Sequence, residues 1–160
     1  MTTPLAAVRV AIGALALAFT VPAARAEPGK IERGRYLVKI AGCNDCHTPG
    51  YAPSAGKVPE SAWLTGDALG WSGPWGTTYP SNLRIALSKM SEAQWVKNAR
   101  SVEYRPPMPW FALRDMKDQD LRAIYAFVRQ LGPLGDPAPA YLPPGQAPKG
   151  PAVQFPAPPK

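Results

Sequence analysis

The residue types in this chain with the clearest chemistry are two cysteines and a histidine in the run Cys43-Asn44-Asp45-Cys46-His47. Cysteines three positions apart on a helical turn lie on one side of it, so both thiols can add to the vinyl groups of one porphyrin. The adjacent histidine then lies beneath the ring, where an imidazole nitrogen can ligate the iron. The pattern Cys-x-x-Cys-His is the attachment signature of c-type haem. It predicts one covalent haem c, attached through Cys43 and Cys46 and ligated by His47.

Other chemistries for this cysteine pair have less support. A structural zinc site would need two further Cys or His ligands, but the chain contains only two cysteines and one histidine. A thioredoxin-like redox pair belongs to a βαβ unit, and no strand-rich pattern surrounds these residues. A plain disulfide between Cys43 and Cys46 is the remaining alternative to haem attachment.

The second axial ligand of the iron decides what such a haem can do. The chain has no second histidine, and its candidate sulfur ligands are Met90, Met108 and Met116. Met90 and Met116 each precede a predicted helix, where they can pack as hydrophobic staples. Met108 lies in the run Arg-Pro-Pro-Met-Pro-Trp at 105–110, whose prolines stiffen the backbone on both sides of it. We therefore expect Met108 to be the ligand, with Met90 and Met116 as alternatives.

Iron that is ligated by histidine on one face and methionine on the other has no free position for oxygen or peroxide. Methionine ligation also raises its reduction potential. Such a centre can do little except pass one electron, so we expect an electron-transfer protein without catalytic residues rather than an enzyme. The alternative, a peroxidase-like enzyme or a sensor with an open iron site, requires Met108 to be off the iron.

Three helices are predicted to position these residues, over 30–41, 92–101 and 118–131. Each range has apolar residues at helical spacing, and the capping-box pattern S-x-x-Q that begins at Ser91 marks the start of the second helix. Gly34 lies on the apolar face of the first helix, where it costs about 1 kcal/mol relative to alanine. A close crossing with another helix would explain that glycine.

A long segment rich in glycine, proline and aromatic residues separates His47 from the second helix. A loop of that length is uncommon in a compact domain, but it suits a chain that wraps a large flat cofactor. The predicted fold is therefore all-α, a domain of three to four helices around a covalent haem with long Gly/Pro/aromatic loops. Four residues of this region are candidates to line the haem ring or to hydrogen-bond a propionate, although packing alone explains them equally well: Trp71, Trp75, Tyr79 and Asn82. Arg105 is a candidate partner for a propionate, but surface solvation is the better explanation of an isolated arginine.

The two ends of the chain differ from its middle. Residues 1–26 combine a basic start, an apolar run over 10–21 and the small-residue pattern Ala-Arg-Ala, which predicts a secretory signal peptide cleaved after Ala26. Twelve apolar residues are too few for a membrane span of about 20, so no transmembrane segment is expected in the mature chain. Bacteria attach haem covalently outside the cytoplasmic membrane, so both signals predict a periplasmic protein.

The mature chain divides into a haem domain over 27–134 and a proline-rich tail over 135–160. The composition of the tail favours extended or disordered chain over a packed core. Val153 and Phe155 are apolar and two positions apart, so a short stretch around them can lie extended against the domain. We expect the tail to act as a linker or strap without chemistry of its own.

The net charge of the chain is basic. It falls from +7 to +5 in the predicted mature chain, because the signal carries Arg9 and Arg25 and no acid. The basic residues are dispersed, as on a solvated surface, and no basic run or glycine-rich phosphate loop indicates nucleic acid. For an electron carrier, the positive charge is expected to steer the protein toward an acidic docking patch on a partner.

Taken together, these motifs resemble those of the class I monohaem cytochromes c over 29–131. The resemblance lies in "RGRYLVKIAGCNDCHTPG", "RPPMPW" and the closing helix "DQDLRAIYAFVRQLG". More narrowly, "GPWGTTYPSNL" followed by "PPMPWFALRDM" is similar to the haem domains of cytochrome subunits that serve periplasmic alcohol, gluconate and aldehyde dehydrogenases. Such subunits often carry three haem domains, whereas this chain has one haem motif.

The resemblance implies a particular fold and role. The first and last helices are expected to cross near Gly34 and Tyr125, and Met108 to face the iron opposite His47. The implied function is a one-electron carrier between a periplasmic dehydrogenase and a terminal oxidase or another cytochrome. The alternative is a haem subunit fixed in a larger oxidoreductase. Relatives commonly have Ser or Thr at the position of Lys117, the cap of the last helix, and the stretch 84–89 lacks an acidic loop typical of the dehydrogenase subunits.

Overall fold

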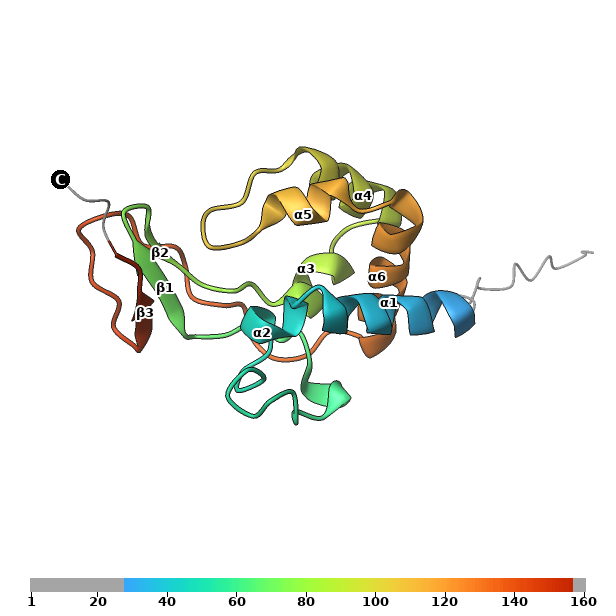
Figure 1. Cartoon of the computed structure of the whole chain (residues 1–160), viewed down its shortest axis with the longest axis horizontal. Coiled ribbons are helices and arrows are strands. Elements are labelled where there is room, and N and C mark those ends of the chain that lie inside the picture. Colours follow the sequence, from blue (N-terminus) through green and yellow to red (C-terminus); the bar gives the residue numbers. More distant parts are fainter. Residues whose placement is uncertain (1–27, 157–160) are drawn as a thin grey trace, which may run out of the picture.

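The computed structural model describes residues 28–156, so the predicted signal peptide lies outside the described residues. Within that range, helices form one end of the molecule and a small sheet forms the other (Figure 1). The helices are α1 (Pro28–Ile40), α2 (Cys43–His47), α3 (Leu83–Ser88), α4 (Glu92–Ser101), α5 (Trp110–Asp115), α6 (Asp118–Leu131) and the short 3-10 helix η1 (Glu60–Ala62). The strands are β1 (Gly70–Gly73), β2 (Gly76–Thr78) and β3 (Ala152–Gln154).

The three predicted helices are confirmed as α1, α4 and α6. Helices α2, α3 and α5 are short, with five or six residues each. The all-α class is confirmed in broad terms, although the sequence analysis did not predict the sheet. No helix among residues 28–156 has the length and apolar character that a membrane crossing needs.

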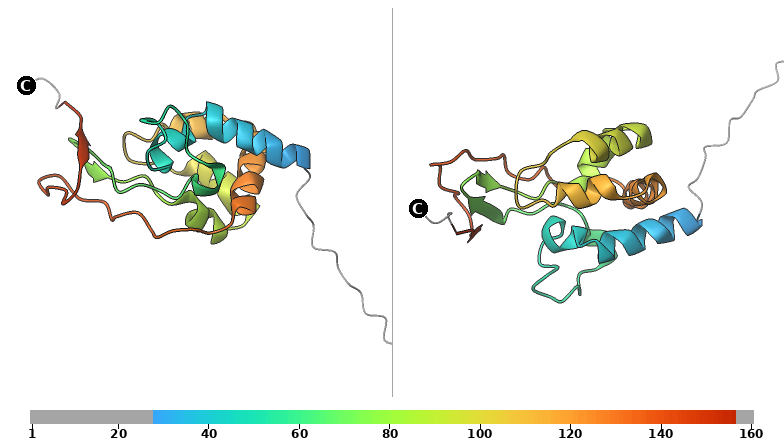
Figure 2. Two further views of the ribbon diagram at one scale, coloured as in Figure 1. Left: turned by 90° about the horizontal axis from the view of Figure 1, so that it is seen from below. Right: turned by 45° about the horizontal axis from the view of Figure 1, so that its top comes forward.

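Helices α1 and α6 cross at Gly34, and they lie against each other in both views of Figure 2. A Cβ atom at position 34 would lie 2.0 Å from the carbonyl oxygen of Ala123 and 2.8 Å from the Cβ of Phe127. No side chain fits in that space, so only glycine lets the two helix backbones approach this closely. Ala123 and Phe127 flank Tyr125 along α6, in agreement with the crossing that the resemblance implies.

The start of α4 has the capping box that the sequence predicts. The Ser91 hydroxyl accepts a hydrogen bond from the Gln94 backbone at 3.2 Å, and the Ser91 backbone donates to the Gln94 side chain at 2.7 Å. The indole of Trp95 donates to the carbonyl of Leu121 at 2.7 Å, which joins α4 to α6. The cap of α6 at Lys117 makes no side-chain hydrogen bond.

Helix α3 contains a buried arginine, an exception to the expectation that the basic residues lie on a solvated surface. Arg84 is only 6% exposed. Its guanidinium donates to the carbonyls of Ser61 at 2.7 Å and Gly132 at 2.5 Å, and also to that of Leu131. The last carbonyls of a helix lack partners within the helix and attract positive charge. Arg84 therefore closes the C-terminal end of α6, and burial lowers its pKa.

The proline-rich tail runs from the end of α6 to the sheet, as the red-orange chain of Figure 2 shows. Strand β3 of the tail pairs in parallel with β1, with Trp71 opposite Val153, and β2 pairs antiparallel on the other side of β1. The ring of Phe155 lies 5.2 Å from that of Trp75 and 6.1 Å from that of Trp71. The stretch around Val153 and Phe155 thus lies extended against the domain, which the sequence had left open.

Candidate haem site

Helix α2 presents both cysteines and the histidine on a single short helix. It begins after Gly42, whose φ of +69° lies in the left-handed region that favours glycine. Cys43 and Cys46 are half-buried and free, so the structure contains no disulfide between them. Their separation of three positions places both thiols on one side of the turn.

His47 is buried, with 9% of its surface exposed, and its ring is oriented by a backbone carbonyl. The Nδ1 atom lies 2.7 Å from the carbonyl oxygen of Ser81. Because a carbonyl can only accept, Nδ1 carries the proton and the lone pair of Nε2 is left free for a metal. Burial lowers the pKa of His47, so the imidazole is held in the neutral form that ligates iron.

The two thiols are kept protonated by their surroundings. Burial raises the pKa of Cys43 to about 11, and burial together with the nearby Asp45 carboxylate raises the pKa of Cys46. In the free protein both sulfurs are therefore held as thiols at neutral pH. Among residues 28–156 no group of three His, Cys, Asp or Glu side chains is arranged to hold a metal ion.

Two buried polar residues join the haem motif to the next segment of chain. Asn44 and Thr48 are 0% and 1% exposed. The Thr48 hydroxyl donates to the Asn44 side chain at 2.8 Å and accepts from the backbone of Leu64 at 2.8 Å. The carbonyl of His47 accepts from the backbone of Gly66 at 2.9 Å. These bonds, like the one that His47 donates to Ser81, fix the motif in place, and no sequence pattern predicted them.

The predicted ligand Met108 lies in a tight loop between α4 and α5. It is half-buried against the edge of the core, as Met90 and Met116 also are, so burial alone does not select one methionine. The Met108 backbone donates to the carbonyl of Arg105 at 3.2 Å, and its carbonyl accepts from Trp110 at 2.9 Å. The loop thus turns sharply on both sides of Met108, whereas Met90 and Met116 lie directly at helix caps.

The cytochrome c family model matches residues 31–132, which is most of the chain. The chain belongs to the cytochrome c family. Membership implies a covalent haem c, and Cys43 and Cys46 fit its attachment motif. The cytochrome motif and fold together support electron transfer through a haem.

Two curated relatives are cytochrome-bearing or dehydrogenase subunits. The chain is 28% identical over 120 residues to a nicotinate dehydrogenase subunit of Pseudomonas putida, and the match covers 69% of this chain. It is 28% identical over 129 residues to the fructose dehydrogenase cytochrome subunit of Gluconobacter japonicus, with 74% of this chain covered. The matches span 9% and 24% of those relatives, so this chain corresponds to a small part of each. No solved structure matches this cytochrome at a significant level.

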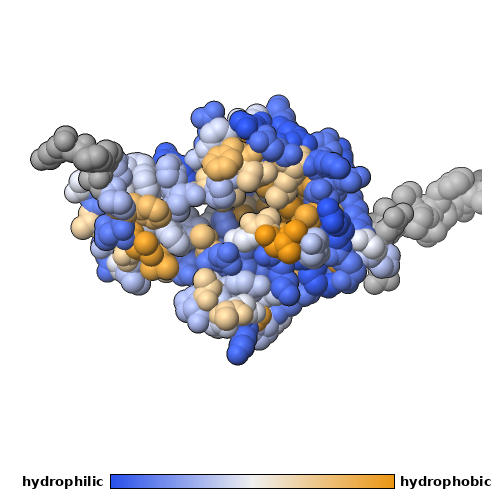
Figure 3. All heavy atoms as spheres, viewed as in Figure 1, coloured by the Kyte–Doolittle hydropathy of each residue, from blue (hydrophilic) through white to orange (hydrophobic). Residues whose placement is uncertain are grey.

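The surroundings of the motif fit a haem. In the space-filling view, apolar side chains gather in the middle of the face between α1 and α5 (Figure 3). Cys43, Leu83 and Met108 all belong to the half-buried edge of the core. Two buried donors have no acceptor among residues 28–156, the side-chain amide of Asn44 within the motif and the indole N–H of Trp71 in β1. A buried N–H without a partner is costly, so an acceptor on a bound group, such as a carboxylate of the cofactor, suits a donor of this kind.

The other candidate haem contacts have partners within the protein. The side chain of Asn82 accepts from the backbone of Ile85 at 3.0 Å, which caps α3, and its amide donates into the tail. The indole of Trp75 donates to the carbonyl of Trp71 at 3.3 Å. The guanidinium of Arg105 lies 3.9 Å from the centre of the Tyr141 ring, stacked on the tail rather than free in solvent.

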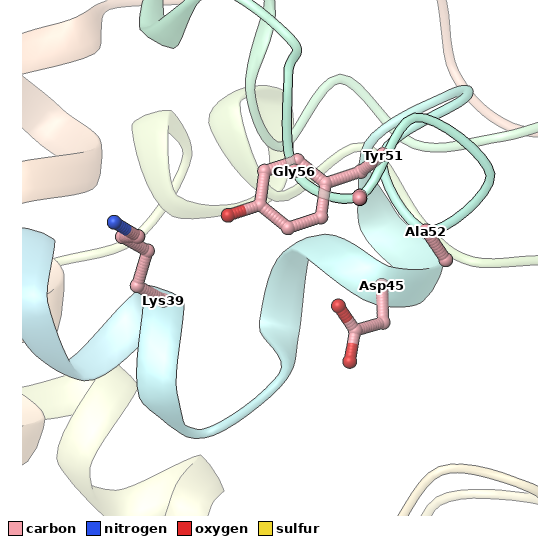
Figure 4. Close-up of a pocket in the computed structure, with 6 residues that line it drawn as sticks. Lys39, Asp45, Tyr51, Ala52 and Gly56 are labelled. Carbon is pink, nitrogen blue, oxygen red and sulfur yellow. The ribbon is translucent and has the colours of Figure 1, made fainter.

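A separate pocket of about 440 Å³ lies beside α2. The side chains of Lys39, Asp45 and Tyr51 point into it in Figure 4, and Ala52, Ala55 and Gly56 complete its lining. The lining does not include Cys43, Cys46 or His47. The pocket thus borders the haem motif through Asp45 but contacts none of the three residues that would bind the cofactor.

Proposed function

We propose that this protein is a periplasmic one-electron carrier whose covalent haem is ligated by His47 and Met108. The observation that carries the proposal is the 2.7 Å contact between His47 Nδ1 and the Ser81 carbonyl, which leaves Nε2 available to iron. When bound, haem c supplies reversible one-electron oxidation and reduction of its iron. With His47 and Met108 both bound to it, the iron would have no position left for a substrate.

The residues of the chain orient, shield and hold this centre. Helix α2 would hold the haem through the two cysteine sulfurs and His47, and the loop at 105–110, between α4 and α5, would supply the Met108 sulfur. In each cycle the protein takes one electron from a reduced donor protein and gives one electron to an oxidised acceptor protein. No substrate bond forms or breaks, and the only histidine is committed to iron, so no acid–base group is required.

The donor that we propose is a periplasmic dehydrogenase, and the acceptor a terminal oxidase or another cytochrome. The names of the two relatives support the dehydrogenase, and the signal-like sequence at 1–26 supports the location. The positive net charge, +5 once residues 1–26 are removed, suits an acidic partner surface. The names of the two relatives also favour a second candidate function, that of a haem subunit fixed in a dehydrogenase complex.

Carbon monoxide tests this function directly, because it binds ferrous haem only where an axial position is open. We expect the reduced wild-type protein to bind carbon monoxide slowly or not at all, and the Met108→Ala variant to bind it rapidly. Fast stoichiometric binding by the wild-type protein would contradict the carrier and favour an open-site sensor or enzyme. Gel filtration of the protein from its native host then separates a free carrier from a fixed subunit.

A further inference from the structure

The proline-rich tail is attached to the domain along most of its described length. At its start, the Asn82 amide donates to the carbonyls of Leu134 at 2.8 Å and Asp136 at 3.1 Å. In its middle, Thr77 and Leu142 exchange two backbone hydrogen bonds of 2.8 and 3.0 Å. At its end, β3 pairs with β1. A segment with so many specific bonds is an ordered part of the domain rather than a free linker.

The surface beneath the tail is shaped to receive it. Gly76 has a φ of +99°, and a Cβ atom at that position would lie 2.2 Å from the carbonyl oxygen of Leu142. The hydroxyl of Tyr141 donates to the carbonyl of Trp75 at 2.7 Å. The β1–β2 hairpin thus has no side chain at Gly76, where Leu142 of the tail crosses it, and it supplies an acceptor for Tyr141, the tail residue just before Leu142.

The same tail and hairpin reach the loop that carries Met108. The Thr78 hydroxyl donates to the carbonyl of Pro106 at 2.7 Å, and the Arg105 guanidinium stacks 3.9 Å from the centre of the Tyr141 ring. Within the described chain, residues 103–109 accept hydrogen bonds from the adjoining helix α5, and the Thr78 bond is the only one that they receive from a segment distant in the sequence. Arg105 and Pro106 are otherwise exposed. The loop therefore depends on the hairpin and the tail for its position.

We propose that the tail is a clamp on the axial ligand loop, with Tyr141, Arg105 and Thr78 as positioning residues that keep the Met108 sulfur on the iron. This inference rests on Met108 being the ligand, as proposed above. An exposed loop with few contacts to the rest of the domain opens readily. Each opening would move the Met108 sulfur off the iron. The clamp lowers the population of the open loop because its contacts form only when the loop is closed.

Imidazole added to the oxidised full-length haem protein measures that population, because it binds iron only when the sulfur has left. Tyr141→Ala removes the ring beneath Arg105 and should raise the apparent imidazole affinity by about fivefold, the size expected of one exposed cation–π contact. Thr78→Val removes the 2.7 Å bond to Pro106, together with a longer 3.4 Å contact to the Trp71 carbonyl, and should raise the apparent imidazole affinity by about fivefold as well. Tyr141→Phe keeps the ring and should change it less than Tyr141→Ala.

The chain offers a matched control for the ring contact. Arg33 lies 5.7 Å from the centre of the Tyr36 ring on α1, and this pair is exposed. Tyr36→Ala removes a longer contact of the same kind from another part of the surface, so it should leave imidazole affinity unchanged. In a double-mutant cycle, Arg105→Gln should have little further effect in the Tyr141→Ala background, because both variants remove the same contact.

The outcomes separate the clamp from the function on which it rests. If the oxidised wild-type protein lacks the sulfur-to-iron absorption band, or Met108→Ala retains it, the proposed ligand is wrong and the clamp falls with it. If that band depends on Met108 but Tyr141→Ala binds imidazole no better than Tyr36→Ala, the clamp alone is overturned. If Tyr141→Ala fails to fold, the imidazole affinities of Arg105→Gln and Thr78→Val test the clamp in its place. Wild-type imidazole affinity in both variants would overturn the proposal.

Discussion

The crossing of α1 and α6 at Gly34 predicts that Gly34→Ala destabilises the protein, even though alanine is the better helix former. The added methyl would lie 2.0 Å from the carbonyl oxygen of Ala123. The obstacle is backbone, so the two helices must separate by more than about 1 Å to restore an ordinary contact. Val38 and Phe127, both fully buried at this interface, would then lose part of their packing.

The expected size of the effect follows from two opposing contributions. Overpacking a tight core costs about 1–3 kcal/mol, and a backbone obstacle places this site at the upper end. The higher helix propensity of alanine than of glycine offsets about 1 kcal/mol of that cost. The free energy of unfolding of the Gly34→Ala haem protein should therefore fall by about 2 kcal/mol.

Guanidinium unfolding followed by tryptophan fluorescence measures this change, because the haem quenches the tryptophans in the folded state. Gly29→Ala is the matched control: it lies on the same helix, and a Cβ atom there would meet nothing within 4 Å. The control should be unchanged or stabilised by up to about 1 kcal/mol. Equal stability of Gly34→Ala and Gly29→Ala would refute the close crossing.

Two further predictions concern polar contacts. Asn82→Asp keeps the oxygen that caps α3 at Ile85 but places a carboxylate against two tail carbonyls, so unfolding free energy should fall by about 2 kcal/mol or more at pH 7. Partial burial raises the pKa of Glu92, but hydrogen bonds from Lys30 and Arg122 outweigh it and lower that pKa. The stabilisation by the ionised Glu92 is therefore present above the unfolded pKa of about 4.3 and is lost as the pH falls through the lower folded value.

Denaturant unfolding at several pH values checks both predictions. Glu92→Gln should be less stable than the wild-type protein at pH 7, and the difference should vanish by about pH 3. A difference that persists unchanged in acid would show that the ion pairs of Glu92 are not its cause. Asn82→Asp should recover stability as its carboxyl is protonated in acid, and a deficit independent of pH would contradict the proposed repulsion.

The parts of the fold that the sequence predicts are those with local signals. Helices α4 and α6 have the predicted bounds because a capping box at Ser91 and an apolar stripe along α6 depend only on neighbouring residues. The sheet was missed because β1 contains two glycines and its partner β3 lies some 80 positions further along the chain. Neither strand has the alternating pattern that identifies a strand in isolation.

The candidate haem site also has parts with a local sequence signal and parts without one. Cys43, Cys46 and His47 form one local motif, so their roles can be predicted from the chemistry of their side chains. The Ser81 contact to His47 uses a backbone carbonyl, which every residue type provides, so no sequence signal marks it. Burial of Arg84 depends on carbonyls of α6 some 47 positions away, which only the fold brings near. The assignment of Met108 as ligand stays a prediction.

The central claim is a haem ligated by His47 on one face and Met108 on the other, and a visible absorption spectrum of the purified protein tests it most directly. We expect the oxidised wild-type protein to show the weak long-wavelength band of a sulfur–iron bond. Met108→Ala should lose this band while the haem stays covalently attached, whereas Met90→Ala and Met116→Ala should keep it. A wild-type spectrum in Met108→Ala, or loss of the band in either control variant, would contradict the account.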